Sequence, residues 1–393
     1  MVPLPSTADF YQFSDMLTAA ERDKLRQLED FLAEHVSPHL AEWWENAVSP
    51  VHLRPMLAKL HLDDDPALLD DTGQPRAVYR GFRNFVFARC DLSVGMLYDG
   101  QVGMFRTVAT QGGSAQQRDR LDGPIRRFDL TGCFALTEPD HGSDIARGLA
   151  TSAVREGDTW RITGRKRWIG NAAHSETIVV IARDEADGQA KAFLVPRTAP
   201  GMRLTTIENK LSIRLVENSD IELDGVEVPE SDRLQNINSF ADIAAILAEL
   251  RPAVTWFAAG MQAGAYEAAL RYTKAREQFG RPIAGFQLIQ EKLARMLGNA
   301  TATLGMAAQL STLRASGRGT EEHSALAKMW TSDRLRETVA LAREVCGGEG
   351  IIVDNDVARF FGDAEAVYTY EGTREINALI VGRAVTGHSA FVK

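Results

Sequence analysis

Residues 241–277, ADIAAILAELRPAVTWFAAGMQAGAYEAALRYTKARE, decide the fold of this chain. The run is rich in alanine and stops at Phe279-Gly280-Arg281-Pro282, so it predicts one long helix. Further helical patterns follow at 286–313, 321–345 and 375–386. Long helices with short connections predict a four-helix bundle.

The zone before the bundle, residues 131–237, has a different period. Short β-branched or alternating runs are separated by polar turns such as Asp187-Gly188 and Asp224-Gly225. Strands are expected at 160–166, 177–182, 191–195 and 220–228. Short strands at regular spacing predict an antiparallel sandwich or barrel.

The first zone, residues 1–130, is predicted to be helical. Residues 18–21 (TAAE) form a capping-box pattern, and apolar residues at helical spacing follow it. The acidic stretch 63–75 predicts an irregular loop. The chain of 393 residues is therefore expected to hold three domains, 1–130, 131–237 and 238–393.

The composition excludes several classes of protein. A net charge of -9 argues against binding to nucleic acid or to an anionic membrane. The three cysteines are far apart and no HExxH pattern occurs, so we expect no disulfide framework, no metal site and a reducing cytoplasm. No apolar run reaches 18 residues, the N-terminus lacks a targeting pattern, and residues 390–393 (AFVK) are not a peroxisomal address.

Two segments at the sheet are suited to a polar, planar ligand. Residues 136–144 (LTEPDHGSD) offer hydroxyl and backbone N–H donors, although an ordinary turn uses the same residues. Residues 167–171 (RWIGN) place an indole at a strand end, where it can face a ring or pack in the core.

Three segments of the helical zone are equally ambiguous by themselves. Residues 275–280 (AREQFG) suit a pyrophosphate and an adenine, or simply end a helix. Gly347-Gly348 follows no strand, so it is not a dinucleotide fingerprint and reads as a helix cap. In residues 367–373 (VYTYEGT), Glu371 is either a base whose pKa is raised by burial or a helix-start carboxylate.

Taken in order, these five segments resemble the acyl-CoA dehydrogenase family over nearly the whole chain after about residue 15. The tail 377–387 (NALIVGRAVTG) is similar to the glutaryl-CoA dehydrogenase-like branch. The resemblance implies an α+β multidomain fold with an N-terminal helical domain, a middle antiparallel β-barrel and a C-terminal four-helix bundle. It also implies FAD between the barrel and the bundle, and usually a homotetramer.

The resemblance assigns roles residue by residue. Cofactor-binding positions are Phe134, Leu136, Thr137, Gly142, Ser143, Trp168, Ile169, Gly170, Arg276, Phe279, Gln287, Glu344, Gly348, Thr373 and Glu375. Substrate positions are Ser143, Leu247, Arg251, Tyr370 and Gly372. Among the cofactor positions, Arg276 and Phe279 match residues that reach the FAD of a neighbouring subunit.

The resemblance implies α,β-dehydrogenation of an acyl-CoA thioester. Glu371 is the expected catalytic base for the α-proton, while flavin N5 takes the β-hydride and the product is a trans-2-enoyl thioester. The expected electron acceptor is electron-transfer flavoprotein, and the expected setting is fatty acid or amino acid catabolism in the cytoplasm.

Four departures from the family pattern leave alternatives open. Gly170 replaces a common threonine, so the reactivity of the flavin toward oxygen is open. Gly95 stands where glutaryl-specific enzymes place an arginine, with Asp99 nearby, which argues against glutaryl-CoA. The acidic loop after His61 alters the domain that shapes the acyl pocket, which leaves an acyl-carrier-protein substrate open. Glu249 lies one residue from the place where some members carry the base.

These departures leave open two functions other than that of a dehydrogenase. One is an acyl-CoA oxidase or another flavin–oxygen enzyme of the same fold. The other is a catalytically silent homologue that binds FAD or CoA, because a fold by itself does not guarantee an activity.

Overall fold

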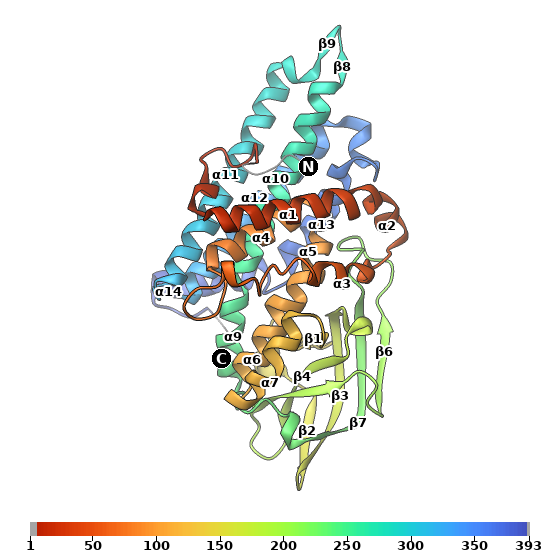
Figure 1. The fold of residues 1–393 in the computed structure, drawn as a ribbon, viewed down its shortest axis with the longest axis vertical. Helices are drawn as coiled ribbons and strands as arrows, with labels where there is room; N and C mark the ends of the chain where they lie inside the picture. The colour runs from red at the N-terminus through yellow and green to blue at the C-terminus, as the bar shows by residue number, and fades with distance from the viewer. Residues whose placement is uncertain (1–5, 391–393) are drawn as a thin grey trace.

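The computed structural model describes residues 6–390. Helices form both ends of this range and a twisted sheet forms its middle (Figure 1). Residues 1–5 and 391–393 lie outside the described part, so most of the C-terminal segment 390–393 discussed above is not covered.

The N-terminal part is helical, as predicted. Its helices are α1 Ala19–His35, α2 Leu40–Asn46, α3 Arg54–Ala58, α4 Ala77–Cys90, α5 Leu92–Asp99, α6 Arg106–Gly112 and α7 Ala115–Arg126. The capping box of α1 is confirmed, since Glu21 N donates to Thr18 Oγ1 at 3.2 Å and Thr18 N donates to Glu21 Oε2 at 2.7 Å. Between α5 and α6 the segment Gly100–Phe105 is a π-helix, a geometry frequent at functional sites.

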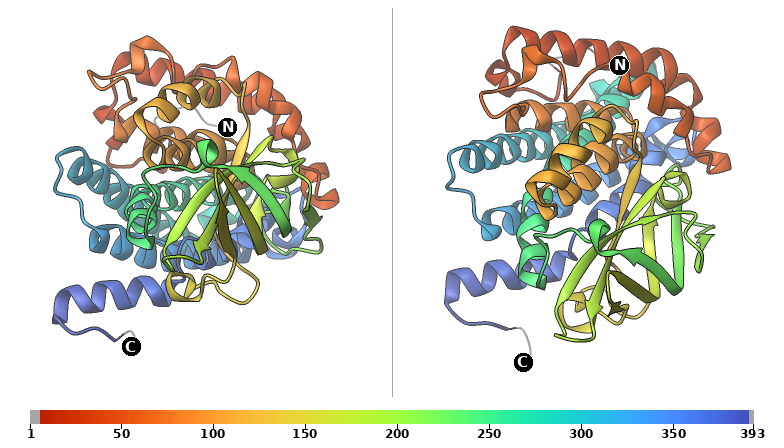
Figure 2. Two further views of the ribbon diagram at one scale, coloured as in Figure 1. Left: turned by 90° about the horizontal axis from the view of Figure 1, so that it is seen from below. Right: turned by 60° about the horizontal axis from the view of Figure 1, so that its bottom comes forward.

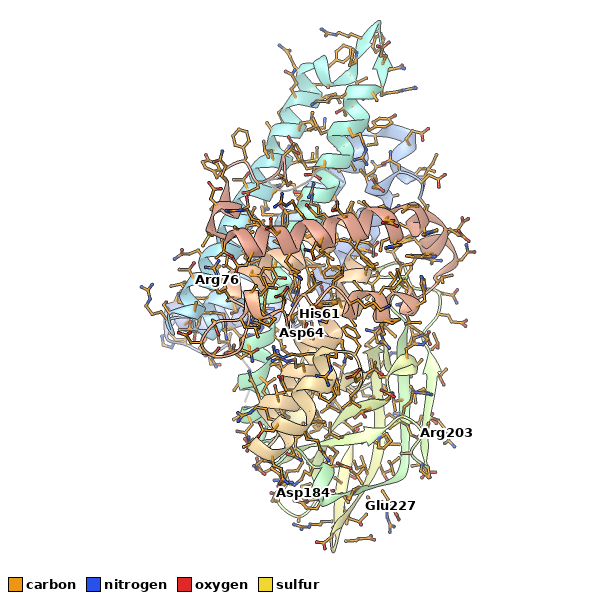
Figure 3. The ribbon with its side chains drawn as sticks, viewed as in Figure 1. His61, Asp64, Arg76, Asp184, Arg203 and Glu227 are labelled. Atoms are coloured by element: carbon orange, nitrogen blue, oxygen red, sulfur yellow. The ribbon has the colours of Figure 1, made fainter. Side chains whose placement is uncertain are left out.

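The acidic loop before α4 lies in the middle of the molecule. Figure 3 shows His61 and Asp64 there, below α1, and His61 Nδ1 lies 3.1 Å from Asp64 Oδ1. Arg76, at the N-cap of α4, joins this region to α1 because its Nε donates to Glu21 Oε1 at 2.8 Å. The loop is therefore tied to the helices on both sides of it.

The middle part contains a seven-stranded sheet with all four predicted strands. Its strands are β1 Gly132–Ala135, β2 Ser152–Glu156, β3 Thr159–Gly170, β4 Thr177–Asp184, β5 Ala190–Pro196, β6 Met202–Thr206 and β7 Asn218–Pro229, with a short helix α8 Ile145–Gly148 after β1. The strand order is β1-β4-β2-β3-β7-β6, with β5 also paired to β4. The sheet curves around a buried core that includes Trp160, Phe193 and Ile221.

The prediction of a wholly antiparallel sheet was wrong for two of its pairings. Strand β4 runs parallel to both β1 and β2. A parallel pair needs a crossover connection, and here β2 and β3 lie between β1 and β4 in the sequence. Alternation along each strand could not reveal that long-range pairing.

The C-terminal part is a helical bundle. Its elements are α9 Phe240–Leu250, α10 Pro252–Ala275, the hairpin strands β8 Glu277–Gln278 and β9 Arg281–Pro282, α11 Gln287–Ala315, α12 Glu321–Val345, α13 Asp356–Thr369 and α14 Arg374–Thr386. The bundle itself is α10 to α13, whereas α14 packs on α12 and extends outward (Figure 2).

Two details of the predicted bundle were wrong. The run 241–277 is two helices, because Pro252 lacks an N–H and begins a new helix after Arg251. The fourth bundle helix is α13, which was not predicted, and the predicted fourth helix is α14.

Helix α10 is the central helix of the fold. By length and composition the stretch Phe240–Ala275 could cross a membrane, but 50% of its most apolar window is buried inside the protein, and one such stretch is weak evidence for a membrane span. A Cβ built on Gly260 would lie 2.3 Å from the carbonyl oxygen of Phe85, so glycine lets α4 approach closely. This contact fixes α4 against the bundle.

Candidate active site

Glu371 lies in a tight turn between α13 and α14. Its φ is +57° and that of Gly372 is +83°, so a non-glycine residue is held in the left-handed region. Lys328 Nζ donates to the carbonyl oxygens of Tyr368 and Gly372, each at 2.8 Å. Asn377 Nδ2 also donates to Gly372 O, at 2.9 Å. These bonds hold the turn from two helices.

Charged groups from three separate elements act on Glu371. Burial raises the pKa of Glu371 above its usual range, the positive charges of Arg251 and Lys328 oppose the rise, and Asp99 adds to it. Arg251 lies at the α9–α10 junction, Lys328 on α12 and Asp99 at the end of α5. The structure therefore brings segments far apart in the chain to one half-buried carboxylate.

Lys328 was missed by the sequence interpretation. Its side chain is fully buried, and this burial lowers its pKa to about 8 although Glu371 and Glu375 favour the charged form. The sequence contained a signal for this residue. Lys328 is a charged residue on the same helix face as Ala325 and Ser332, and that face of α12 is buried.

Three predicted site residues next to Glu371 in the sequence differ in their surroundings. The Tyr370 hydroxyl is buried and has no hydrogen-bond partner among residues 6–390. Thr373 caps α14 by accepting from Ile376 N at 3.2 Å. Glu375 is exposed on the first turn of α14. A buried hydroxyl without a partner is the type of group that a bound ligand satisfies.

The two sheet segments lie side by side. Arg167 N donates to Thr137 O at 2.9 Å, and Lys166 Nζ donates to Leu136 O at 3.0 Å. Trp168 has φ +66° at an irregularity of β3, and its side chain is 52% exposed. The sequence left open whether this indole packs in the core, and the structure shows that it does not.

The other predicted residues of this region vary in exposure. Phe134, Gly170 and Leu247 are half-buried, Ile169 is buried, and Gly142 and Ser143 are exposed in the loop after β1.

The end of β3 lies beside the π-helix that follows Asp99. A Cβ built on Gly100 would lie 3.3 Å from Asn171 Nδ2, and Asn171 Oδ1 is buried without a partner in the described part of the chain. Asn171 directly follows Gly170. The Trp168 segment, Asp99 and Glu371 therefore belong to one region between the sheet and the bundle.

A second group of predicted residues lies at the opposite end of the bundle. Arg276, Phe279, Gln287, Glu344 and Gly348 are all exposed, around the β8–β9 hairpin and the adjoining helix ends. Helix α10 has 24 residues and so spans roughly 36 Å between Arg251 and Arg276. Figure 1 shows the hairpin at one extremity of the molecule and the sheet at the other. One chain therefore does not bring the two groups together.

Glu249, the alternative base, points elsewhere. It forms an ion pair with Arg314 of α11 and is half-exposed. It is not among the charged groups that shift the pKa of Glu371. The geometry therefore favours Glu371 over Glu249.

Two further features of the described residues bear on ligand binding. Within residues 6–390 no group of three or more His, Cys, Asp or Glu side chains could hold a metal ion. A cavity of about 640 Å³ opens elsewhere, lined by Arg54, Arg127 and His174 among others, and none of the predicted site residues lines it.

Two protein-family models match this chain over the sheet and the bundle. The model for the acyl-CoA dehydrogenase middle domain matches residues 133–226, and that for the C-terminal domain matches residues 240–386. A probable acyl-CoA dehydrogenase of Bacillus subtilis is 29% identical over 93% of this chain and 98% of its own length.

Solved structures are similar along the whole molecule. A glutaryl-CoA dehydrogenase from Mycobacterium smegmatis has a TM-score of 0.92 and 35% identity, covering 98% of this chain and 99% of that one. A glutaryl-CoA dehydrogenase from the same organism in complex with FADH2 has a TM-score of 0.90 and 30% identity, covering 98% of each chain. With the N-terminal helices, the middle sheet and the C-terminal bundle all shared, this chain belongs to the acyl-CoA dehydrogenase family.

Proposed function

We propose that this protein is an FAD-dependent acyl-CoA dehydrogenase in which Glu371 removes the α-proton of the acyl thioester. The observation that carries the proposal is the position of Glu371. Glu371 is half-buried and is held in a strained turn by Lys328 and Asn377. It also lies near Asp99, and the π-helix that follows Asp99 borders the end of β3. Strain of this kind is retained mainly at functional sites.

The residues present fit a flavin. The uncovered indole of Trp168 offers an apolar face to a planar ring. The orphaned Asn171 Oδ1 and Tyr370 hydroxyl supply polar atoms at the edge of the same region. A Cβ at Gly142 would meet nothing within 4 Å, so the space beside the loop after β1 is open to a ligand. A similar solved structure is in complex with FADH2.

The chain's own groups then have distinct tasks. Phe134, Leu136, Thr137, Gly142, Ser143, Trp168, Ile169 and Gly170 would hold the cofactor from the sheet side, with Thr373 and Glu375 on the bundle side. Ser143, Leu247, Arg251, Tyr370 and Gly372 would bind the thioester and its CoA chain. When bound, FAD supplies the acceptor for the β-hydride.

Glu371 performs the proton transfer. Its carboxylate takes the α-proton as the C–H bond breaks, and a positioned base of this kind contributes about 10²–10⁴-fold. The Glu371 N–H donates to no other group in the described part of the chain, so it is free to bind the thioester carbonyl. One such preorganised donor is typically worth roughly 3 to 4 kcal/mol.

We also propose that the enzyme is a homo-oligomer, with a tetramer expected. Arg276, Phe279, Gln287, Glu344 and Gly348 lie at the far end of α10 from Glu371 and would bind the cofactor of a neighbouring subunit. Phe279 is 94% exposed, which suits a residue that is covered by another copy.

Electron-transfer flavoprotein is the proposed electron acceptor, and the cytoplasm is the proposed location. Cys90, Cys133 and Cys346 are buried and unpaired, in agreement with a reducing compartment. The oxidase alternative depends on Gly170, where an added Cβ would be in ordinary van der Waals contact with Val216 at 3.4 Å and with Asn218 at 3.6 Å, so a methyl group fits at this position.

The test is anaerobic reduction of the bound flavin. Purified protein should be yellow with FAD and should be bleached by acyl-CoA thioesters without oxygen. Rapid reoxidation by air would favour the oxidase, whereas slow reoxidation by air with fast transfer to electron-transfer flavoprotein favours the dehydrogenase. A colourless protein that takes up no FAD, or a yellow one that no thioester bleaches, would overturn the proposal.

A further inference from the structure

Asp99, a neighbour of Glu371, has a carboxylate that uses only part of its hydrogen-bonding capacity. Three charged side chains influence Glu371, namely Arg251, Lys328 and Asp99. Arg251 pairs with Glu321 at 3.4 Å, and Lys328 donates to two backbone carbonyls. Asp99 is therefore the charged neighbour with an oxygen left to bind a ligand.

Only one oxygen of Asp99 has a partner. Arg83 Nη2 donates to Oδ1 at 2.9 Å, and Asn84 Nδ2 donates to the same atom at 3.1 Å. No described residue donates to Oδ2. The Asp99 side chain is 15% exposed, so Oδ2 is not sealed inside the protein.

The local backbone keeps this carboxylate in place. Asp99 ends α5, and the π-helix Gly100–Phe105 begins at the next residue. A Cβ built on Gly103 would lie 2.5 Å from Asp99 Oδ1, so any larger residue at 103 would displace the carboxylate. Glycine on a π-helix thus makes room for Asp99.

The charge behind Asp99 does not suit a second carboxylate. Arg83 is buried and shared between Asp99 and Asp63, and Asp63 also accepts from Tyr98 at 2.7 Å. The donor atoms of this guanidinium are engaged by Asp63, Asp99 and Asn84, so it is not free to bind a further carboxylate. Arg80 adds a more distant positive charge, but no hydrogen bond joins it to either carboxylate within residues 6–390.

Gly95 is closely packed and leaves little room for a larger side chain. A Cβ there would lie 3.1 Å from Phe87 Cβ and 3.2 Å from a ring carbon of Phe257. A dicarboxylate chain would therefore meet the carboxylate of Asp99, whose bonded cation Arg83 is already engaged.

We propose that Asp99 receives the distal end of the acyl chain and selects an acyl group that ends in a hydroxyl over one that ends in a methyl or a carboxylate. The inference rests on the proposed function, since it takes the acyl group to be held with its α-carbon at Glu371. The hydroxyl donates to Asp99 Oδ2, and the hydrogen bond is strengthened by the charge of the acceptor. A site built to bind a hydroxyl rejects analogues that leave its buried polar atom unpaired.

The test uses FAD-loaded protein and thioesters of matched length. Valeryl-CoA, 5-hydroxyvaleryl-CoA and glutaryl-CoA are titrated anaerobically, followed by butyryl-CoA and 4-hydroxybutyryl-CoA. In the unmodified enzyme, the hydroxyacyl thioester of each length should half-bleach the flavin at a concentration about tenfold lower than its apolar counterpart. Glutaryl-CoA should be the weakest of its set.

Three variants test whether the carboxylate of Asp99 causes this order of preference. Asp99→Leu should reverse the order, so that valeryl-CoA becomes the better substrate. Asp99→Asn, which keeps the shape, should reduce the discrimination against glutaryl-CoA. Asp122→Asn removes a different carboxylate that pairs with arginine in the same domain and should leave the order unchanged.

The outcomes distinguish this inference from the proposed function. If apolar and hydroxyacyl thioesters bleach equally well and neither Asp99 variant changes the order, the dehydrogenase stands and the role of Asp99 is overturned. Preference for glutaryl-CoA would also overturn it and would point to Arg80. If no thioester bleaches the yellow enzyme, both fail.

Discussion

Lys328 lies beneath the turn that carries Glu371 and donates a hydrogen bond of 2.8 Å to the carbonyl of Gly372. The same ammonium group also holds the last turn of α13 through Tyr368 O. The turn that carries Glu371 is thus fixed from α12, and a positive charge is placed next to the carboxylate of this residue. One side chain both orients Glu371 and opposes the rise in its pKa.

Replacing Lys328 should impair positioning more than cofactor binding. Lys328→Met keeps most of the volume but leaves two carbonyl oxygens without a donor, so the turn should shift. A misplacement of this kind can cost about 10²-fold in rate. Stopped-flow reduction of the flavin measures the rate, and bound FAD measures the fold. A Lys328→Met enzyme that is reduced at the unmodified rate would contradict a positioning role.

The pH dependence of flavin reduction should report the charges around Glu371. The base must be ionised, and its pKa is raised, so the acid limb of the rate profile should lie above the ordinary range of a glutamate. Lys328→Met removes a charge that lowers this pKa and should move the limb to higher pH. Asp99→Asn removes a charge that raises it and should move the limb to lower pH. Shifts in the same direction for both variants would refute this electrostatic account.

The close packing of α5 should make Gly95 intolerant of a side chain. Gly95→Ala places a methyl group against Phe87 and Phe257, and overpacking of this kind typically costs about 1–3 kcal/mol. Gly298→Ala is the matched control, because it lies within α11 and its Cβ would meet nothing within 4 Å. Thermal unfolding of FAD-loaded protein compares the two. Equal stability of the two variants would show that α5 has more room than the structure indicates.

Much of this architecture could be predicted from local patterns. The strand at 160–166 and the helix at 321–345 were evident, because alternation and helical spacing depend on neighbours in the chain. The break at Pro252 followed from the absence of a proline N–H, but the alanine-rich pattern around it concealed the change of helix. The parallel pairing of β1 with β4 joins distant segments, so no local pattern encodes it.

The candidate site also combines features that local patterns predict with features that only the folded chain reveals. Glu371 was predicted to be the base because its flanking residues resemble a family motif, although local physics alone left its role open. Lys328 and the Arg83–Asp99 pair depend on contacts between helices that are distant in sequence. The division of the cofactor residues into two groups depends on the length of α10, which places Arg276 far from Glu371. Such relationships arise only from the folded chain.

Because the β8–β9 hairpin is exposed in the single chain, we expect the protein to retain FAD only when its subunits are assembled. Phe279→Ser should weaken the subunit contact and release FAD together with it, since Phe279 is 94% exposed in the single chain. Leu211→Ser is the control, because Leu211 is also exposed, at 68%, but lies near α13 on another face. Light scattering coupled to flavin absorbance measures both quantities. A Phe279→Ser protein that keeps its mass and its FAD would argue against a shared cofactor site.

The most direct test of the central claim is anaerobic flavin reduction by Glu371→Gln. Glutamine preserves the size of the side chain and the backbone N–H but cannot accept the α-proton. The account predicts that this variant remains yellow, with FAD bound, and is not bleached by any thioester that bleaches the unmodified enzyme, while Glu249→Gln is bleached normally. Retained bleaching by Glu371→Gln, or its loss in Glu249→Gln, would contradict the assignment of Glu371 as the base.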